Sequence, residues 1–319
     1  MPIRISSTPL GPVVIRAVEG NDEVVPRVNA SEYLRTVGKR VLAPYCKLPG
    51  AACAVITGSS AEGLSDFHSD LDMIVYYDAL PAEEAIRAIR ATLTAAPLQW
   101  SLGSYAEEEF IESFRVEGIE CQIVHTTVEQ WERQMRETLA GKEPGGPLHK
   151  AMSGTLAAIP VHGAERLERW KALLRDYPEE LRIAMVRQHL KFFALWGVND
   201  RLEIRDSELW FRQSLLESSF NLIGVCAGLS KRYFSTFQFK RGGRFYETLT
   251  VAPRDFARRL EGLWHVPRRQ AVRDLRDLVA ETVELVEREL PHDADRQRGV
   301  DTSACRTALA RNDPPWEPA

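Results

Sequence analysis

The stretch TGSSAEGLSDFHSDLDMIVYY, Thr57 to Tyr77, places two aspartates one residue apart at the mouth of a β-branched run. Side chains two apart on a strand point the same way, so Asp70 and Asp72 are expected on one face of a sheet. Two carboxylates held a few ångströms apart repel one another, and they are stable together mainly when a cation lies between them. The pair therefore predicts a divalent metal site, and Mg²⁺ suits its hard carboxylate oxygens best.

A plainer interpretation is a polar turn that enters a strand, with Ser69 or Asp70 capping backbone groups. Gly58, Ser59 and Ser60, about a dozen residues upstream of the pair, favour the metal site instead. They follow a buried strand, where glycine permits close backbone approach and the next amides and hydroxyls can cradle phosphate oxygens. The combination predicts a site for a metal-bound phosphate compound.

The composition limits the class of protein. The chain has 319 residues, of which 44% are hydrophobic, enough for two domains with buried cores. A net charge of −4 gives no overall electrostatic reason to expect a nucleic-acid or membrane-surface protein. The apolar runs are much shorter than the ~20 residues that span a bilayer, so no membrane association is expected. No secretory signal is visible in MPIRISSTPLGPVVIRAV, so we expect a cytoplasmic location.

The order of patterns predicts an α/β part followed by an all-α part. NASEYLRTVGKRVLAPY, ACAVITG and DLDMIVYYD read as helix, strand and strand, and GIECQIVHTT alternates like a half-buried strand. The segment GKEPGGPLHK is rich in glycine and proline and indicates a domain boundary. Beyond it the sequence reads as helices only, beginning with GAERLERWKALLRDY and ending with PRRQAVRDLRDLVAETVELVEREL. One of these expected helices is PEELRIAMVRQHLKFFALWG, residues 178–197.

We therefore expect four regions. Residues 1–28 form an irregular segment, residues 29–143 a catalytic α/β domain with a mixed sheet, residues 144–291 a helical substrate-binding or nucleotide-binding domain, and residues 292–319 a mobile tail. Five cysteines occur without a CxxC pair, which argues against a zinc site or a disulfide framework.

The motif resembles the signature of the DNA-polymerase-β-like nucleotidyltransferase superfamily, in which a hydrophobic-Gly-Ser run is followed by Asp-x-Asp. The GSSAEG and SDLD segments are similar to the minimal and the aminoglycoside- and lincosamide-nucleotidyltransferase-like enzymes. The resemblance implies a mixed sheet with helices and two Mg²⁺ ions that join Asp70 and Asp72 to a nucleoside triphosphate. It also implies phosphate contacts from Gly58 and Ser59, and we include Ser69 among the nucleotide-binding residues.

Such enzymes usually carry a third carboxylate on a neighbouring strand, which holds metal or takes the acceptor's proton. In VEGIECQIVH, Glu120 is the acid within the strand, and alternation puts it on the same face as Gln122. Either position could be the family's third site. An amide at that site could not act as a base, and a plain solvated strand residue is the alternative for Glu120.

A second cluster of charge lies in GLSKRYFSTFQFKRGGRFYETL, where five cations alternate with aromatic residues: Lys231, Arg232, Lys240, Arg241 and Arg244. Cations and rings together could meet a triphosphate and a base, and we expect Lys240 to be the first triphosphate contact. The alternative is a helical segment that packs on its aromatics and keeps its charges in water.

The expected activity is transfer of a nucleoside monophosphate, AMP from ATP, to a hydroxyl of a small molecule, with release of pyrophosphate. A protein or tRNA acceptor is the first alternative, although the composition shows no strongly basic surface for tRNA. A catalytically silent nucleotide-binding module is the second. No pattern in the sequence specifies the acceptor, the base or the oligomeric state.

Overall fold

The computed structural model describes residues 29–94, 96–237, 239–292 and 299–311. The expected irregular segment, residues 1–28, lies outside them. The chain divides into two compact units, which we call the sheet unit (Met1–Met135 and Gly154–Arg175) and the helical unit (Arg136–Ser153 and Asp176–Ala319). The expected fold class, a mixed sheet with helices followed by helices only, is confirmed.

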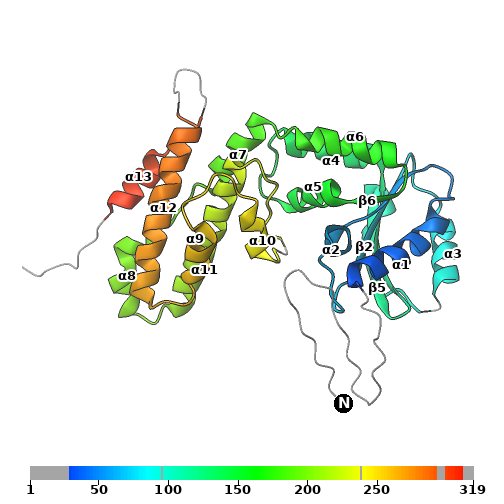
Figure 1. Cartoon of the computed structure of the whole chain (residues 1–319), viewed down its shortest axis with the longest axis horizontal. Helices are drawn as coiled ribbons and strands as arrows, with labels where there is room; N and C mark the ends of the chain where they lie inside the picture. Colours follow the sequence, from blue (N-terminus) through cyan, green and yellow to red (C-terminus); the bar gives the residue numbers. More distant parts are fainter. Residues whose placement is uncertain (1–28, 95, 238, 293–298, 312–319) are drawn as a thin grey trace, which may run out of the picture. The chain divides into compact units, whose positions relative to one another are not determined.

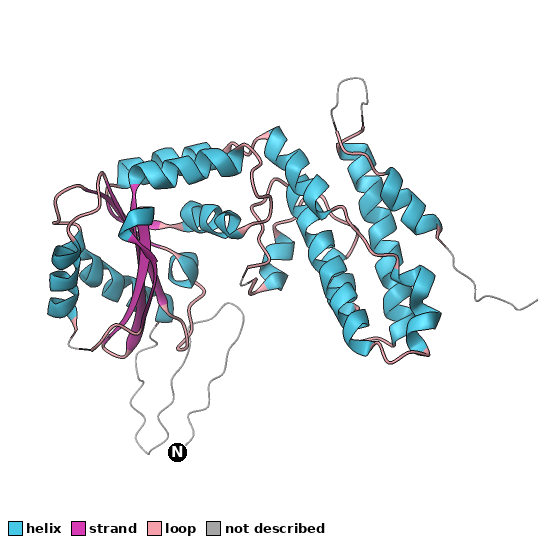
Figure 2. Ribbon diagram, turned by 180° about the vertical axis from the view of Figure 1, so that it is seen from behind, coloured by secondary structure: helices cyan, strands magenta, loops and turns pink. Residues whose placement is uncertain are grey.

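A six-stranded sheet organises the sheet unit, in the order β3-β4-β5-β2-β1-β6. Its strands are β1 (Ala51–Ile56), β2 (Leu71–Tyr77), β3 (Trp100–Ser104), β4 (Glu109–Val116), β5 (Ile119–Thr127) and β6 (Ile159–His162). Strands β2 and β5 are parallel and the other neighbours are antiparallel, so the sheet is mixed. Figure 2 shows these strands together in one sheet.

Helices of the sheet unit include α1 (Ala30–Tyr45), α2 (Gly58–Glu62), α3 (Glu83–Leu93) and α6 (Ala164–Arg175), and η1 (Tyr105–Glu107) is a short 3₁₀ turn. Helix α1 begins as the sequence predicts, because the Asn29 side chain accepts hydrogen bonds from the amides of Ser31 and Glu32. Helices α4 (Val128–Leu139) and α5 (Pro147–Ala157) each contain a division between the units. Figure 1 labels most of these elements.

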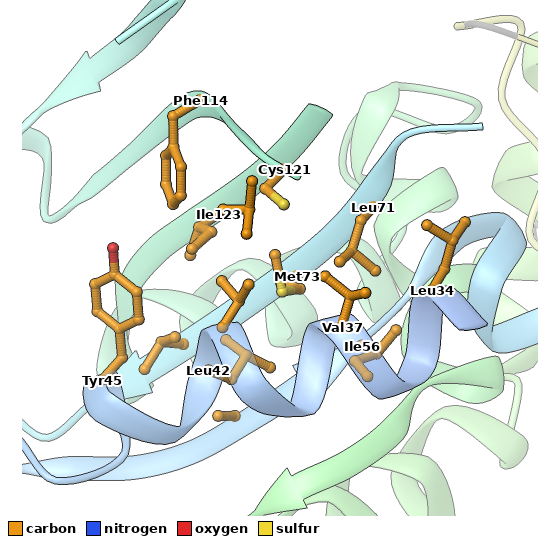
Figure 3. Packing of buried hydrophobic residues seen from close by; sticks show 14 of the residues in the cluster. Leu34, Val37, Leu42, Tyr45, Ile56, Leu71, Met73, Phe114, Cys121 and Ile123 are labelled. Carbon is orange, nitrogen blue, oxygen red and sulfur yellow. The ribbon is translucent and has the colours of Figure 1, made fainter. Parts of the chain in front are cut away.

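One face of the sheet packs against α1 and α3. Alternate residues of the strands, such as Met73 and Ile123, meet α1 residues such as Val37 and Leu42, and all are almost fully buried (Figure 3). Because strand side chains alternate, the residues between them point to the other face. There Tyr76 packs on Trp131 of α4 and Trp170 of α6. Asp72 shares the face of Tyr76, so the acidic motif lies opposite the α1 core.

A buried polar network lies on the α1 face. Glu112 accepts hydrogen bonds from Tyr45 and Arg90 and contacts His125, whose other ring nitrogen meets the Tyr77 hydroxyl. Burial alone would raise the pKa of Glu112, but the hydrogen bond and charge of His125 and the charge of Arg90 outweigh it and keep this pKa below its ordinary value. The network therefore holds a charged carboxylate within the core.

The helical unit contains only helices among its described residues. Beyond the parts of α4 and α5 that it shares, these are α7 (Glu179–His189), α8 (Leu195–Glu203), α9 (Glu208–Leu229), α10 (Gly242–Glu247), α11 (Phe256–Gly262), α12 (Arg268–Glu289) and α13 (Ser303–Ala310). Helices α7, α9 and α12 share a core that includes Val186, Val225 and Val286. None of the helices among the described residues is long and apolar enough to cross a membrane.

Three elements differ from the sequence-based expectation. The chain enters the helical unit at Arg136 and returns to the sheet unit at Gly154, so β6 and α6 lie with the sheet although they fall within the expected helical domain, residues 144–291. Strand β6 has four residues and contains Pro160, which hides a strand pattern, yet it pairs with β1. The predicted helix over 178–197 is interrupted after His189, where the Asn221 amide binds the Lys191 carbonyl oxygen.

The expected mobile tail is wrong for residues 303–310, which form α13. Cys305 and Leu309 of this helix are buried, and Arg306 forms an ion pair with Glu287 of α12. The Trp196 indole also donates to the Ala308 carbonyl oxygen. Residues 303–310 contain few apolar residues within a polar stretch, so the sequence pattern alone does not indicate a helix there. Contacts with the rest of the helical unit stabilise it. All five cysteines are free, as the sequence predicts.

Candidate active site

Asp72 lies in β2, and Asp70 lies just before that strand. The Thr57 amide donates to the Asp72 carbonyl oxygen, which ties the end of β1 to the start of β2. Gly58 follows with a φ of +62°, in the left-handed region that favours glycine, and a Cβ built there would overlap the Asp72 carboxylate. Position 58 therefore favours glycine for two reasons, the positive φ and the absence of space for a Cβ. The missing side chain lets the backbone lie directly against Asp72.

The loop between the two strands is held by its own hydrogen bonds. Ser59 and Ser60 both contact the Ser65 hydroxyl at 3.2 Å, and Arg35 of α1 donates to the carbonyl oxygens of Ser60 and Ala61. These contacts hold the short α2 turn, in which Ser59 is half-buried. A phosphate contact from Gly58 and Ser59 stays a prediction.

Ser69 has a role within the loop. Its hydroxyl donates to Asp66 Oδ1 at 3.1 Å and accepts from the Asp66 amide at 2.9 Å, while the His68 amide also donates to Asp66. This closed turn sets the chain direction just before Asp70. The nucleotide-binding role expected for Ser69 stays a prediction, since its hydroxyl is already engaged.

Gln122 connects the candidate acids. It lies directly across the parallel β2–β5 pair from Asp72, and its amide nitrogen donates to Asp70 Oδ2 at 3.0 Å and to Glu120 Oε1 at 3.2 Å. Two acceptors of one nitrogen lie within roughly 6 Å of each other, so Asp70 and Glu120 are neighbours. Glu120 and Gln122, the two positions that the sequence left open for the third acid, therefore both lie at the site. The Gln122 amide contacts Asp70 directly.

Glu120 Oε1 accepts two further hydrogen bonds, from the Ser113 hydroxyl at 2.9 Å and from the Trp100 indole at 3.3 Å. The hydrogen bond from Ser113 is the main cause that lowers the pKa of Glu120; burial opposes it, and Trp100 and Gln122 add to it. Glu120 is therefore a half-buried carboxylate that three hydrogen bonds orient, and its catalytic role stays a prediction.

These residues form a row across one face of the sheet. Trp100 pairs with Ser113, Ser113 with Gln122, and Gln122 with Asp72. No local pattern in the sequence marks Trp100 or Ser113 as site residues. The register that brings them beside Glu120 depends on pairing between segments, which one sequence does not display.

A cavity of about 570 Å³ opens beside the acids, within the sheet unit. It lies between the beginning of α1, the loop over residues 66–70 and the β4–β5 turn over residues 115–120. Both Asp70 and Glu120 line it. Its volume falls in the range of roughly 300–1,000 Å³ that small-molecule sites occupy.

The ligand atoms at the N-terminal end of β2 fit a hard divalent cation. Asp70 and Asp72 offer carboxylate oxygens, and the neighbouring amide and hydroxyl groups add further oxygens, the donor set that Mg²⁺ prefers. Among the residues that the structure describes, no group of three or more acid, histidine or cysteine side chains could hold a metal ion. Binding of two Mg²⁺ ions, and a metal contact from Glu120, therefore stay proposals.

Lys240 lies in the helical unit, where it is exposed and where the described residues give it no hydrogen bond or ion pair. Phe239, its neighbour, packs against Phe220, Phe234 and Phe245 within the helical unit, whereas Phe237 is 51% exposed. The alternation of rings and cations thus has a packing explanation for most of the rings, and the triphosphate contact by Lys240 stays a prediction.

No known family model matches the chain, and no curated protein matches it. Among solved structures, the chain is similar to the crystal structure of a nucleotidyltransferase-like protein from Exiguobacterium sibiricum 255-15. The identity is 12%, the match covers 81% of this chain and 77% of that chain, and the TM-score is 0.38. At this distance the likeness assigns no residue, so the site rests on the geometry of this chain.

Proposed function

We propose that this protein is a nucleotidyltransferase that moves AMP from ATP to a hydroxyl of a small molecule and releases pyrophosphate. The observation that carries the proposal is the close approach of Gly58 to Asp72 at the N-terminal end of β2. Asp70 lies just before this strand. A backbone loop lies directly against a pair of acids, which is an arrangement suited to a metal-bound triphosphate.

In this reaction the acceptor oxygen forms a bond to the α-phosphorus of ATP, and the bond from that phosphorus to the bridging oxygen breaks. Pyrophosphate takes the electron pair of the broken bond, and the acceptor hydroxyl gives its proton to a carboxylate, for which Glu120 is the candidate. Mg²⁺ bound by Asp70 and Asp72 would activate the attacking oxygen and stabilise the leaving group. Gln122 orients Asp70, and Ser113 and Trp100 orient Glu120, so the acids are held before substrate arrives.

The test is incubation with Mg²⁺ and ATP labelled at either the α or the γ phosphate, followed by separation of small molecules, RNA and protein. Label from the α position in a small product supports the proposal. Label from the α position in protein or tRNA would move the acceptor to a macromolecule. Label from the γ position alone would replace nucleotidyl transfer with phosphotransfer, and ATP binding without any product would indicate a silent module.

A further inference from the structure

The cavity beside Asp70 and Glu120 is lined by residues of the sheet unit. Its described walls combine three kinds of chemistry: exposed aromatic rings, carboxylates and a guanidinium. The rings are Tyr33 of α1 and Phe67 of the loop before β2, the carboxylates belong to that loop and to Glu120 of β5, and the guanidinium is that of Arg115 in β4. This is the feature from which the chemistry of the acceptor can be read.

The aromatic wall consists of Tyr33 and Phe67. Tyr33 is 47% exposed and Phe67 is 43% exposed, although both are large side chains that are usually more buried. Leu34 and Ile119 lie in the same cavity and extend the apolar surface. Exposed rings around a concavity are typical of a surface that a flat, apolar part of a ligand covers.

The carboxylates of the cavity already have donors. Asp66 accepts from the His68 amide and the Ser69 hydroxyl, Asp70 accepts from Gln122, and Glu120 accepts from three groups through Oε1. Hydrogen bonds from these neutral donors leave the negative charge of the carboxylates in place. Under the proposed function, Mg²⁺ would offset the charge of Asp70, and the acids would then mark where the reacting hydroxyl lies.

Arg115 is the cationic side chain among the described residues that line this cavity. It lies across the β4–β5 pair from Glu120, and its guanidinium donates to the Gly118 carbonyl oxygen at 2.8 Å. Within the described part of the chain it forms no ion pair with a carboxylate. A guanidinium has five N–H donors, so most of its capacity remains for an anionic group such as a carboxylate or a phosphate.

We propose that this cavity is the acceptor site and that it takes a small hydroxylated aromatic compound with a negatively charged group. The ring lies against Tyr33 and Phe67, the anionic group pairs with Arg115, and the hydroxyl lies toward Asp70 and Glu120. The position of the hydroxyl and the preference for an anion rest on the proposed function and its Mg²⁺, whereas the ring contacts do not.

The test uses 4-hydroxyphenylacetate and tyramine as probes, because both carry a hydroxyphenyl ring and they differ in the sign of charge. Ligand-observed NMR with Mg²⁺ and without ATP measures binding to the full chain. We expect 4-hydroxyphenylacetate to bind more tightly than tyramine. Arg115→Gln should weaken binding of the acid about tenfold, the loss expected for a hydrogen bond to a charged group, and should leave tyramine unchanged.

Phe67→Ser should weaken both probes at least about threefold, because it removes part of the aromatic wall. Phe193→Ser is the matched control, since Phe193 is also 43% exposed but lies in the helical unit, and it should leave binding unchanged. The proposal is overturned if neither probe binds, if tyramine binds more tightly, or if Arg115→Gln or Phe67→Ser has no effect. These results do not depend on label transfer, so the acceptor site and the nucleotidyl transfer can fail separately.

Discussion

The side-chain amide of Gln122 donates a hydrogen bond of 3.0 Å to Asp70 Oδ2. The same nitrogen also donates to Glu120, so one neutral group holds two acids. The resemblance noted in the sequence implies an acid on this strand, and the amide occupies the place directly across from Asp72. Gln122 thus reduces the repulsion between Asp70 and Glu120.

Gln122→Glu should make the protein more dependent on divalent cations. A third carboxylate beside Asp70 and Glu120 adds repulsion, and a loss of roughly 1 kcal/mol would lower Tm by about 2–4 °C in EDTA. Mg²⁺ should restore this loss, so the rise in Tm on adding Mg²⁺ should be larger than in the wild type. Differential scanning calorimetry with and without Mg²⁺ measures both values.

Gln134→Glu is the matched control, because Gln134 also donates to a carboxylate, that of Glu109, but at another place on the sheet unit. It should lose stability without any recovery on adding Mg²⁺. An equal Mg²⁺ response in the two variants would contradict a metal site at Asp70 and Asp72.

Asp70→Asn and Asp72→Asn should each lower nucleotidyl transfer at least about a hundredfold, since the metal contact is worth several kcal/mol in the transition state. The fold should remain, because asparagine keeps the size of the side chain. Asp78→Asn is the control at the other end of β2, where the acid is exposed and meets only Arg166 at 3.8 Å. Label transfer and circular dichroism measure the two effects, and full activity in either site variant would remove the metal assignment.

Gly58→Ala should cost more stability than Gly118→Ala. Both glycines have a positive φ, which costs alanine roughly 1–2 kcal/mol, but a Cβ at position 118 has open space while one at position 58 overlaps Asp72. We expect about 1 kcal/mol for Gly118→Ala and at least about 2 kcal/mol for Gly58→Ala. Urea denaturation compares them. An equal decrease in the free energy of unfolding for the two variants would show that position 58 has room for a Cβ beside Asp72.

The face of the acidic motif could be predicted from the sequence because alternation along a strand is a local property. Asp70, Asp72 and Gly58 lie where a single stretch places them, and Glu120 and Gln122 share a face as the period of two requires. The partners of Glu120 could not be predicted in this way. Trp100 and Ser113 reach it only through the register of β3, β4 and β5, which is set by pairing between segments far apart in sequence.

The same distinction explains the errors in the fold. Strand β6 has four residues and contains a proline, and it exists because β1 offers an edge to pair with. Helix α13 is stabilised by the burial of Cys305 and Leu309 and by the ion pair between Arg306 and Glu287. In both segments the local pattern is weak and the tertiary contacts supply the stability.

A buried histidine in the helical unit predicts a loss of stability in acid. His149 is 0% exposed, and neither of its ring nitrogens has a hydrogen-bond partner among the described residues. Burial, with a smaller contribution from the charge of the nearby His189, lowers the pKa of His149 from 6.5 to about 4. The folded protein therefore binds a proton at this site less readily than the unfolded chain.

The stability that His149 contributes as a neutral group is complete above pH 6.5 and should be lost as the pH falls from 6.5 to about 4, by up to roughly 3 kcal/mol. His149→Phe removes the titrating group but keeps a ring beside Tyr233, so it should flatten this part of the profile. His68→Phe, at an exposed position, should leave the profile unchanged. Urea denaturation between pH 4 and 8 measures the three curves. A profile for His149→Phe that falls as steeply as the wild type would assign the acid sensitivity to other groups, of which buried His189 and His125, whose pKa values burial also lowers, are the first to examine.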